Sequence, residues 1–248
     1  MNIVSFSGGK DSTAMLLMML EKGIPVDKVI CVDTTKEIPA MYRHIEKVQQ
    51  MIEPLKIEIV KIDFDYFFGE KVITRGVNKG KKGYGWTGAR GRWCTACKIN
   101  AIKKITKTFQ GNYTHFIGIA SDERKRLEKK YLKESSISLP LVEWGITEKQ
   151  ALEYCYSKGL DWGGLYEKFH RVSCWCCPLS RIGELRVLYN EFPELWKELQ
   201  EMDKKSFRNF KSDYSVADLT ERFANEKQKI VDANEKLVKE LKYAIHGK

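Results

Sequence analysis

The sequence has no long apolar run, no leader-like N-terminus and no low-complexity tract. No window approaches the roughly 18 consecutive apolar residues that a membrane helix needs, and no basic segment precedes the first apolar run. We therefore expect a cytoplasmic protein without a membrane partner. A length of 248 residues, 43% hydrophobic residues and a mean hydropathy of −0.42 are typical of a globular chain and exclude disordered and collagen-like classes.

Acidic residues are absent from residues 71–107, although the chain has 33 of them. This segment holds 11 of the 43 Lys and Arg residues, which accounts for the whole net charge of +10. Bases, glycines and aromatics such as Tyr84, Trp86 and Trp93 alternate here, which predicts a surface for a nucleotide or a nucleic acid, tRNA or DNA. The alternative is a solvated loop whose aromatic side chains fold back on the core.

Apolar residues alternate between strand and helix spacing along the first half of the chain. This pattern predicts an α/β fold, a mostly parallel sheet with helices on both faces. We expect a nucleotide-binding domain over residues 1–142, followed by a cysteine-bearing and helical region over residues 143–248. The expected strands are 2–6, 28–32, 56–62 and 114–119, and the expected helices are 11–22, 37–51, 95–109, 148–157, 180–189 and 193–202.

The last 45 or so residues predict an amphipathic helix with a polar face. Its apolar residues recur at helical spacing: Leu219, Phe223, Ile230, Leu237 and Leu241. We expect this helix to pack on the body of the protein. The alternative is a contact between two copies of the chain in a homodimer.

Residues 7–13, Ser-Gly-Gly-Lys-Asp-Ser-Thr, follow an apolar strand and begin a helix. In this position backbone N–H groups and the helix dipole favour a bound phosphate. Glycines allow the close approach, Lys10 supplies a positive charge, and the hydroxyl groups add donors. The spacing differs from the Walker pattern. The segment therefore predicts a phosphate loop of another kind.

Seven cysteines without a leader sequence do not indicate a disulfide framework. Cys94 with Cys97 and Cys174 with Cys177 form two Cys-x-x-Cys pairs, which supply the four thiolates of a zinc site or a [4Fe–4S] cluster. Cys176 is the substitute ligand. The alternatives are reduced thiols in the core or a redox-active pair. Two further predictions concern the remaining cysteines and a histidine: Cys31 and Cys155 lie in the core, and His170 is a minor candidate ligand.

The Ser-Gly-Gly-Lys-Asp-Ser string resembles the pyrophosphate loop (PP-loop) of the ATP pyrophosphatase superfamily, whose members cleave ATP between the α and β phosphates. Further motifs resemble the phosphoadenosine phosphosulfate (PAPS) reductase-like family, in particular members found in phages. These motifs are Val32-Asp33-Thr34, Arg92-Trp93-Cys94-Thr95, Leu139-Pro140-Leu141 and Gly164-Leu165-Tyr166. The resemblance covers residues 1 to about 200 and implies a sheet of the adenine-nucleotide α-hydrolase type.

The resemblance also implies roles for individual residues. Lys10 and Asp11 would be catalytic, with Asp11 holding Mg²⁺, and the pyrophosphate of ATP would lie against Ser7, Gly8, Gly9, Ser12 and Thr13. Asp33 and Thr34 would lie beside the nucleoside. The substrate would contact Arg90, Arg92, Arg124 and Arg126. Related reductases and tRNA-thiolating enzymes hold iron–sulfur clusters, so the resemblance favours an iron–sulfur cluster over zinc as the group bound by the four cysteines.

Two features separate this sequence from the reductases of the resembling family. Those enzymes carry a C-terminal catalytic cysteine, whereas no cysteine follows Cys177 here, and their phosphate loop is degraded, whereas Lys10 and Asp11 are retained. We therefore expect cleavage of ATP to AMP and pyrophosphate, with adenylation of an acceptor for sulfur transfer to a nucleobase or nucleic acid. The alternatives are a sulfonucleotide reductase or another sulfate-assimilation enzyme, and a noncatalytic nucleic-acid-binding protein with a structural metal.

Overall fold

The computed structural model describes residues 1–88, 91–109 and 111–246, and it divides the chain into two compact units. Unit 1 comprises Met1–Phe64 and Arg92–Cys177, and unit 2 comprises Asp65–Gly91 and Pro178–Lys248. This division differs from the expected boundary at residue 142. The reason is that residues 143–177 pack within unit 1, whereas Trp86 packs in unit 2 against Phe210. None of the helices in the described ranges is long and apolar enough to cross a membrane.

Unit 1 is built on a five-stranded sheet with the order β3-β2-β1-β4-β5, and every neighbouring pair is parallel. The central strand β1 is buried at Ile3 and Val4, and Val4 is paired with Val29 on one side and Phe116 on the other. The predicted parallel sheet is confirmed. The strands are β1 (Asn2–Ser5), β2 (Lys28–Asp33), β3 (Ile57–Lys61), β4 (Thr114–Ile117) and β5 (Ile137–Ser138).

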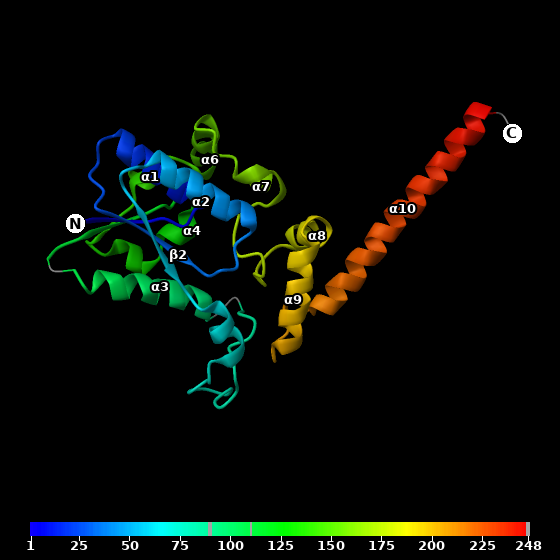
Figure 1. Cartoon of the computed structure of the whole chain (residues 1–248), viewed down its shortest axis with the longest axis horizontal. Helices are drawn as coiled ribbons and strands as arrows, with labels where there is room; N and C mark the ends of the chain where they lie inside the picture. The colour runs from blue at the N-terminus through cyan, green and yellow to red at the C-terminus, as the bar shows by residue number, and fades with distance from the viewer. Residues whose placement is uncertain (89–90, 110, 247–248) are drawn as a thin grey trace. The chain divides into compact units, whose positions relative to one another are not determined.

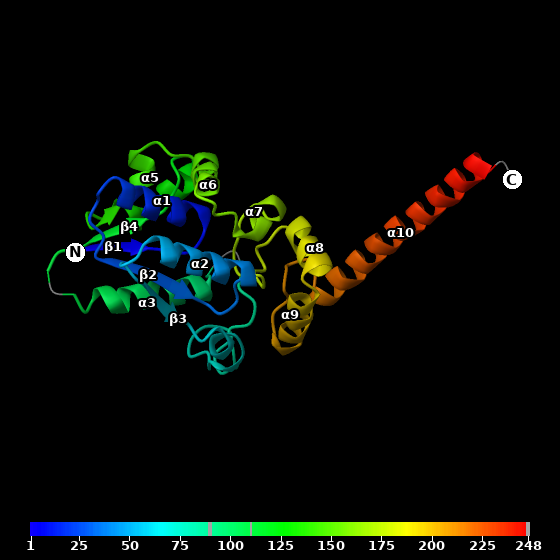
Figure 2. The same cartoon turned by 45° about the horizontal axis from the view of Figure 1, so that its top comes forward.

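Helices cover both faces of this sheet, as expected from right-handed crossovers. Helices α1 (Lys10–Glu21) and α2 (Pro39–Met51) lie on one face, and α3 (Trp93–Thr106) lies on the other (Figures 1 and 2). Helix α6 (Glu148–Ser157) packs on α1 and begins with the capping box of Thr147 and Gln150. Shorter helices complete unit 1: α4 (Arg124–Leu127), α5 (Pro140–Glu143), α7 (Leu165–Lys168), and the 3₁₀ turns η2 (Lys130–Lys133) and η3 (Trp162–Gly164).

Unit 2 joins the basic glycine-rich segment to the C-terminal helices. A short π-helix, η1 (Tyr66–Glu70), is followed by a hairpin in which Val72 pairs with Lys82. Its helices are α8 (Ile182–Glu191), α9 (Pro193–Lys205) and α10 (Val216–His246). Trp86 is only 2% exposed and donates from Nε1 to Asp203 Oδ1 at 2.6 Å. The expectation that Trp86 is a surface stacking residue is therefore wrong, because the ring completes the core of unit 2.

Helix α10 matches the expected packing only in its first turns. Leu219 and Phe223 are buried, whereas Ile230, Leu237 and Leu241 are 52–63% exposed. Figure 1 shows the helix continuing past α8 and α9, the neighbours against which its beginning packs. The prediction of a helix packed along its whole apolar stripe is therefore wrong, and the homodimer contact remains a prediction.

Candidate functional site

The phosphate loop lies where the strand order of the sheet reverses. Strand β1 has β2 on one side and β4 on the other, and ligands of open α/β sheets bind beyond the carboxyl ends of strands at such a point. The chain leaves β1 at Ser5 and enters α1 at Lys10. Gly8 has φ +75°, and an added Cβ would lie 2.8 Å from Met41 Sδ. Only glycine suits this position, because the backbone is left-handed and the space is filled.

The loop is held in shape by its own hydroxyl groups and by a tryptophan. Ser12 Oγ accepts from the Ser7 N–H at 3.1 Å and donates to the Gly9 carbonyl at 3.0 Å. Trp162 is 2% exposed and donates from Nε1 to the Gly8 carbonyl at 2.7 Å. These bonds fix the backbone before any ligand arrives, so a phosphate would meet oriented donors.

Lys10 is buried beside two carboxylates. Its Nζ lies 3.2 Å from Asp11 Oδ2 and 2.6 Å from Glu148 Oε1. Burial works to lower the Lys10 pKa, but the two carboxylates together raise it above its ordinary value. Lys10 therefore carries a full positive charge at the start of α1. The sequence motif predicted Lys10, whereas Glu148 is its partner only because α6 packs on α1.

Asp11 is a carboxylate with an unused oxygen. Burial raises its pKa to about 6 despite the opposing effect of Lys10, and Glu123 and Glu148 raise it further. Asp11 Oδ1 is buried and has no hydrogen-bond partner within the described residues. A buried carboxylate oxygen of this kind is a chemically suitable ligand for a magnesium ion, and Glu123 lies near enough to raise the Asp11 pKa. This structure therefore offers one oxygen ligand at the place where the resemblance implied the metal.

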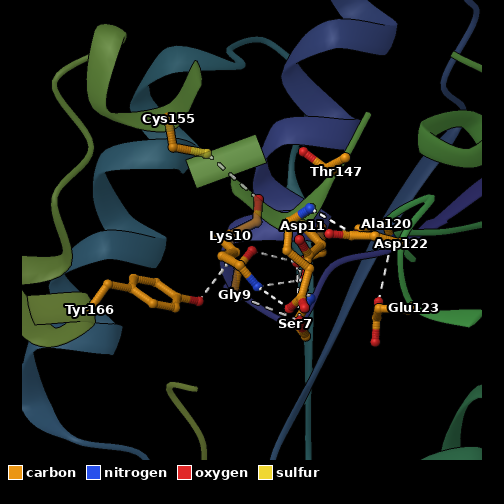
Figure 3. Close-up of polar contacts among 12 residues, drawn as sticks. Ser7, Gly9, Lys10, Asp11, Ala120, Asp122, Glu123, Thr147, Cys155 and Tyr166 are labelled. Atoms are coloured by element: carbon orange, nitrogen blue, oxygen red, sulfur yellow. Dashed lines mark hydrogen bonds and ion pairs between the residues drawn. The ribbon is translucent and has the colours of Figure 1, made fainter. Parts of the chain in front are cut away.

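Tyr166 on α7 contacts the loop at the N-terminus of α1. Its hydroxyl accepts from the Lys10 N–H at 2.9 Å, which is the kind of contact that a phosphate oxygen would make there. Figure 3 shows Tyr166 reaching the loop from one side, with Asp122 and Glu123 on the other. Tyr166 belongs to the Gly164-Leu165-Tyr166 motif that resembles the family, but no role was predicted for it from the sequence.

Gly118 is a second residue of the site that the sequence did not single out. It follows β4 directly, and a Cβ at this position would lie 2.7 Å from both the Cα and the N of Ser12. Backbone atoms cannot move aside as a flexible side chain could. Gly118 therefore allows the end of β4 to lie against the first turn of α1. In the sequence, the only indication of this role was a glycine near the end of the strand predicted over 114–119.

Asp33 and Thr34 at the end of β2 make local contacts. Asp33 Oδ1 accepts from the Thr35 N–H at 2.7 Å and from the Tyr42 hydroxyl at 3.1 Å. Thr34 is fully buried, and its hydroxyl lies 3.2 Å from Cys174 Sγ. Asp33 therefore stabilises the turn after the strand, and nucleoside binding by these two residues stays a prediction.

His44 packs under the loop and gives the site a pH-dependent stability. It is 2% exposed, stacks on Trp162 with ring centroids 4.2 Å apart, and shares a 3.1 Å hydrogen bond with Thr13 Oγ1. Burial, with a smaller effect of Lys47, lowers the pKa of His44 to about 4. In the unfolded chain His44 is protonated as the pH falls below about 6.5, whereas in the folded chain it stays neutral at that pH.

We expect the His44 contribution to folding to be complete above about pH 6.5 and to be lost as the pH falls towards 4, at a cost of about 2–3 kcal/mol. Urea unfolding at pH 7.5 and 4.5 measures the loss. His44→Gln should lose less stability on acidification than the unchanged chain. Asp11 has an opposing effect, but it is present in both proteins, so its contribution cancels when the two losses are compared. An equal loss in the two proteins would contradict this role for His44.

One cysteine of each pair, Cys94 and Cys174, lies near Lys98. Cys94 lies on α3, and Cys174 Sγ donates to Glu37 Oε1 at 3.3 Å. Both cysteines lie near the Lys98 ammonium, since they raise its pKa together with Glu37. No three His, Cys, Asp or Glu side chains converge closely enough to hold a metal ion in the part of the chain that the structure describes. The donor chemistry fits a thiolate centre, whereas the arrangement does not complete one.

The pKa values of these thiols disfavour the redox interpretation. Burial raises the pKa of Cys174 to about 12, and burial also raises the pKa of Cys97 and of Cys176. A redox-active pair needs a thiolate near neutral pH. The core positions of Cys31 and Cys155 are confirmed, because both side chains are buried.

The three candidate arginines within the described residues lie in two different segments, Arg92 before α3 and Arg124 and Arg126 on α4. Arg90 lies outside the described residues, and Arg92 is exposed just before α3. Arg126 pairs with Glu123 at 3.1 Å, and Arg124 is exposed. A small pocket of about 400 Å³ is lined by residues 122–126. Substrate binding by these arginines stays a prediction.

Comparison with known sequences identifies a family and two relatives. The phosphoadenosine phosphosulfate reductase domain matches residues 1–180. An uncharacterized protein of Methanocaldococcus jannaschii is 31% identical over 206 residues, which cover 79% of this chain and 40% of the relative. An uncharacterized nin region protein of Escherichia phage lambda is 31% identical over 161 residues, 54% of each protein. The chain thus spans about half or less of the length of these curated relatives.

Two solved structures also align with the chain at 16% identity. One is the U34-tRNA thiolase NcsA of Methanococcus maripaludis with its [4Fe-4S] cluster, with a TM-score of 0.41 over 82% of this chain and 70% of that one. The other is a predicted subunit of a tRNA methyltransferase of Methanocaldococcus jannaschii, with a TM-score of 0.35 over 84% of this chain and 92% of that one.

Proposed function

Because the chain belongs to the phosphoadenosine phosphosulfate reductase domain family, as its motifs predicted, we propose that it is a PP-loop enzyme that cleaves ATP to AMP and pyrophosphate and adenylates an acceptor. The observation that carries this proposal is the loop after β1. Between Ser7 and Asp11 it combines a backbone fixed by hydrogen bonds, the buried Lys10 cation and an Asp11 oxygen that has no partner within the described residues. A loop that served only as a turn would not need a buried ion pair.

The proposed reaction is a displacement at the α-phosphorus. An acceptor oxygen forms a bond to that phosphorus, the bond to the oxygen bridging the α and β phosphates breaks, and pyrophosphate leaves with the electron pair. Negative charge grows on the leaving group, where Lys10 and the N–H groups at the start of α1 stabilise it. The Lys10 N–H becomes available to phosphate when the Tyr166 hydroxyl moves away.

Asp11 and Glu123 would hold the magnesium ion, which neutralises charge on the polyphosphate when bound. The chain's own contribution is to keep Asp11 ionised and oriented. Lys10 does this by lowering the Asp11 pKa against the effect of burial. Cys155 also helps to fix the start of α1, since its thiol donates to the Lys10 carbonyl at 3.6 Å.

ATP labelled at the α-phosphate tests the proposed reaction in the full chain. We expect labelled AMP rather than labelled ADP, and a requirement for Mg²⁺. Asp11→Asn should lower the rate by about 100-fold or more, because the metal loses a charged ligand. Asp232→Asn on α10 is a matched control that removes an exposed carboxylate and should leave the rate unchanged. Labelled ADP as the product would overturn the proposal.

Sulfur transfer to a nucleobase or nucleic acid is the proposed use of the adenylated acceptor. The cysteine pairs of unit 1 and the acid-free segment 71–107 support it, because thiolates can hold a metal centre and bases can hold phosphates. Both features were predicted from the sequence. Neither the acceptor nor a sulfur donor is needed for the test of ATP cleavage described above.

The metal content of the protein tests the proposed thiolate centre. We expect anaerobically purified protein to contain stoichiometric iron or zinc, and Cys94→Ala with Cys177→Ala to lose it. Cys31→Ala is the control, since this thiol is buried in β2 and should leave the metal content unchanged. Elemental analysis decides between iron and zinc. Full metal content in the double variant would remove the assignment of these cysteines.

A further inference from the structure

Unit 2 contains a pocket of about 900 Å³ that none of the proposed catalytic residues lines. Its walls come from three segments of this unit: residues 86–88, residues 178–182 and residues 207–214. This volume is in the range of cavities that hold a small organic ligand or a nucleotide. The phosphate loop belongs to unit 1, so the pocket needs an explanation of its own.

An exposed aromatic ring with two cations stands in the wall of this pocket. Phe207 is 39% exposed. Lys81 Nζ lies 4.6 Å from the centre of its ring, and the Arg208 guanidinium lies 5.3 Å from it. A ring for stacking beside cations for phosphate is the combination that binds nucleotides.

The wall is rigid because its loop is tied down at several points. Ser206 Oγ accepts from the Trp86 N–H at 3.2 Å and from the Arg208 N–H at 3.1 Å. Lys211 Nζ donates to the carbonyls of Pro178 and Ser180, each at 2.7 Å. The loop that presents Phe207 is thus fixed before any ligand binds, and a fixed wall loses little entropy on binding.

A buried hydroxyl group in the pocket wall has no partner. Thr87 lines the pocket and is 91% buried, and its Oγ1 makes no hydrogen bond to any residue that the structure describes. An unpaired buried hydroxyl lowers the stability of the folded chain. A ligand with hydrogen-bonding groups, such as a nucleobase, would relieve this cost.

Basic side chains extend from the pocket along the hairpin of residues 71–83, here called the basic hairpin. Its backbone is paired through Ile73 N–H to the Lys81 carbonyl at 2.9 Å and Gly83 N–H to the Lys71 carbonyl at 2.9 Å. The hairpin has no acidic residue, and Arg75, Lys79, Lys81 and Lys82 are exposed. Lys81 links the two features, since it belongs to the hairpin and lies over Phe207.

We propose that this pocket binds an unpaired nucleotide of a nucleic-acid strand, with its base beside Phe207 and the neighbouring phosphates on the basic hairpin. A single strand is favoured over a duplex, because a concave pocket can receive a base only when that base is not stacked in a helix. The row of cations suits a polymer better than a mononucleotide, since several phosphates can be contacted at once. This binding is argued from unit 2 alone, and only the idea that the bound strand is also the acceptor of the adenylation rests on the proposed function.

Binding of a fluorescently labelled 12-nucleotide single strand to the full chain tests this proposal. We expect Phe207→Ala to weaken binding by about tenfold, because one stacked base is lost. Phe207→Trp keeps an aromatic face and should bind within about twofold of the unchanged chain. Lys81→Ala with Lys82→Ala should weaken binding and reduce its dependence on salt. Lys197→Ala removes an exposed cation of α9 and serves as the matched control.

Three results would overturn the proposal. The first is unchanged affinity in Phe207→Ala. The second is duplex binding as tight as that of the single strand. The third is AMP binding as tightly as the strand and with the same loss in Phe207→Ala, which would make the ligand a mononucleotide.

The failure of the proposed function would look different from these results. Lys10→Ala should bind the strand with unchanged affinity, because Lys10 belongs to unit 1. If no ATP cleavage is found while strand binding still depends on Phe207, the pocket assignment stands and the catalytic one falls. If ATP cleavage is normal while strand binding is unaffected by Phe207→Ala, the catalytic assignment stands and the pocket assignment falls.

Discussion

Replacing Lys10 with alanine is expected to lower the rate of ATP cleavage by about 100-fold or more. The substitution removes the cation that faces the growing charge on pyrophosphate. It also leaves the carboxylates of Asp11 and Glu148 without their positive partner, so that they repel the polyphosphate. Steady-state rates with ATP labelled at the α-phosphate, at saturating and low ATP, separate the effect on the reaction from the effect on binding.

Lys149→Ala is the matched control for Lys10→Ala. Lys149 follows Glu148 on α6, but its side chain is 84% exposed and pairs with Glu153 at the surface. We expect its removal to leave the rate within about twofold, because exposed ion pairs contribute little. Thermal unfolding of both variants checks that they are folded. Equal rates in the two folded variants would contradict the role of Lys10.

Replacing Gly118 with alanine is expected to raise the KM for ATP by at least about tenfold and to lower the free energy of unfolding by about 1–3 kcal/mol. The added methyl group would lie 2.7 Å from backbone atoms of Ser12, and no rotation of a side chain can relieve that contact. The first turn of α1 must therefore shift away from β4. A shifted turn misplaces the N–H donors that the phosphate needs, so binding suffers together with stability.

Gly183→Ala controls for the loss of a glycine as such. Gly183 lies in α8, and an added Cβ would meet no heavy atom of the described residues within 4 Å. We expect a neutral or slightly stabilising effect, since alanine favours a helix more than glycine does. Nucleotide binding and urea unfolding are measured on both variants. Unchanged nucleotide binding in Gly118→Ala would show that β4 does not position the loop.

The sequence predicted those parts of the site that are local. The strand, the loop of residues 7–13 and the helix after it are contiguous, so apolar spacing and glycine positions were enough to locate them. The helix over 148–157 was predicted for the same reason, and the capping box that begins it spans only four residues. The parallel sheet followed from the order of its elements.

The sequence could not supply contacts between distant segments. Tyr166 reaches the Lys10 N–H across 156 residues, and Glu148 reaches Lys10 Nζ across 138. Trp86 lies in the basic, glycine-rich segment that was predicted to form a binding surface, yet it bonds to Asp203 in the core of unit 2. Such pairings depend on which segments pack together, and composition carries no information about that.

A crystal structure of the full chain with magnesium and α,β-methylene ATP, which cannot be cleaved between the α and β phosphates, would show whether residues 7–13 hold the phosphates of ATP. We expect the β and γ phosphates against the N–H groups at the start of α1, the metal on Asp11, and the contact between Tyr166 and the Lys10 N–H replaced by phosphate. A nucleotide bound with its phosphates away from residues 7–13, and with the Tyr166 contact intact, would contradict this expectation.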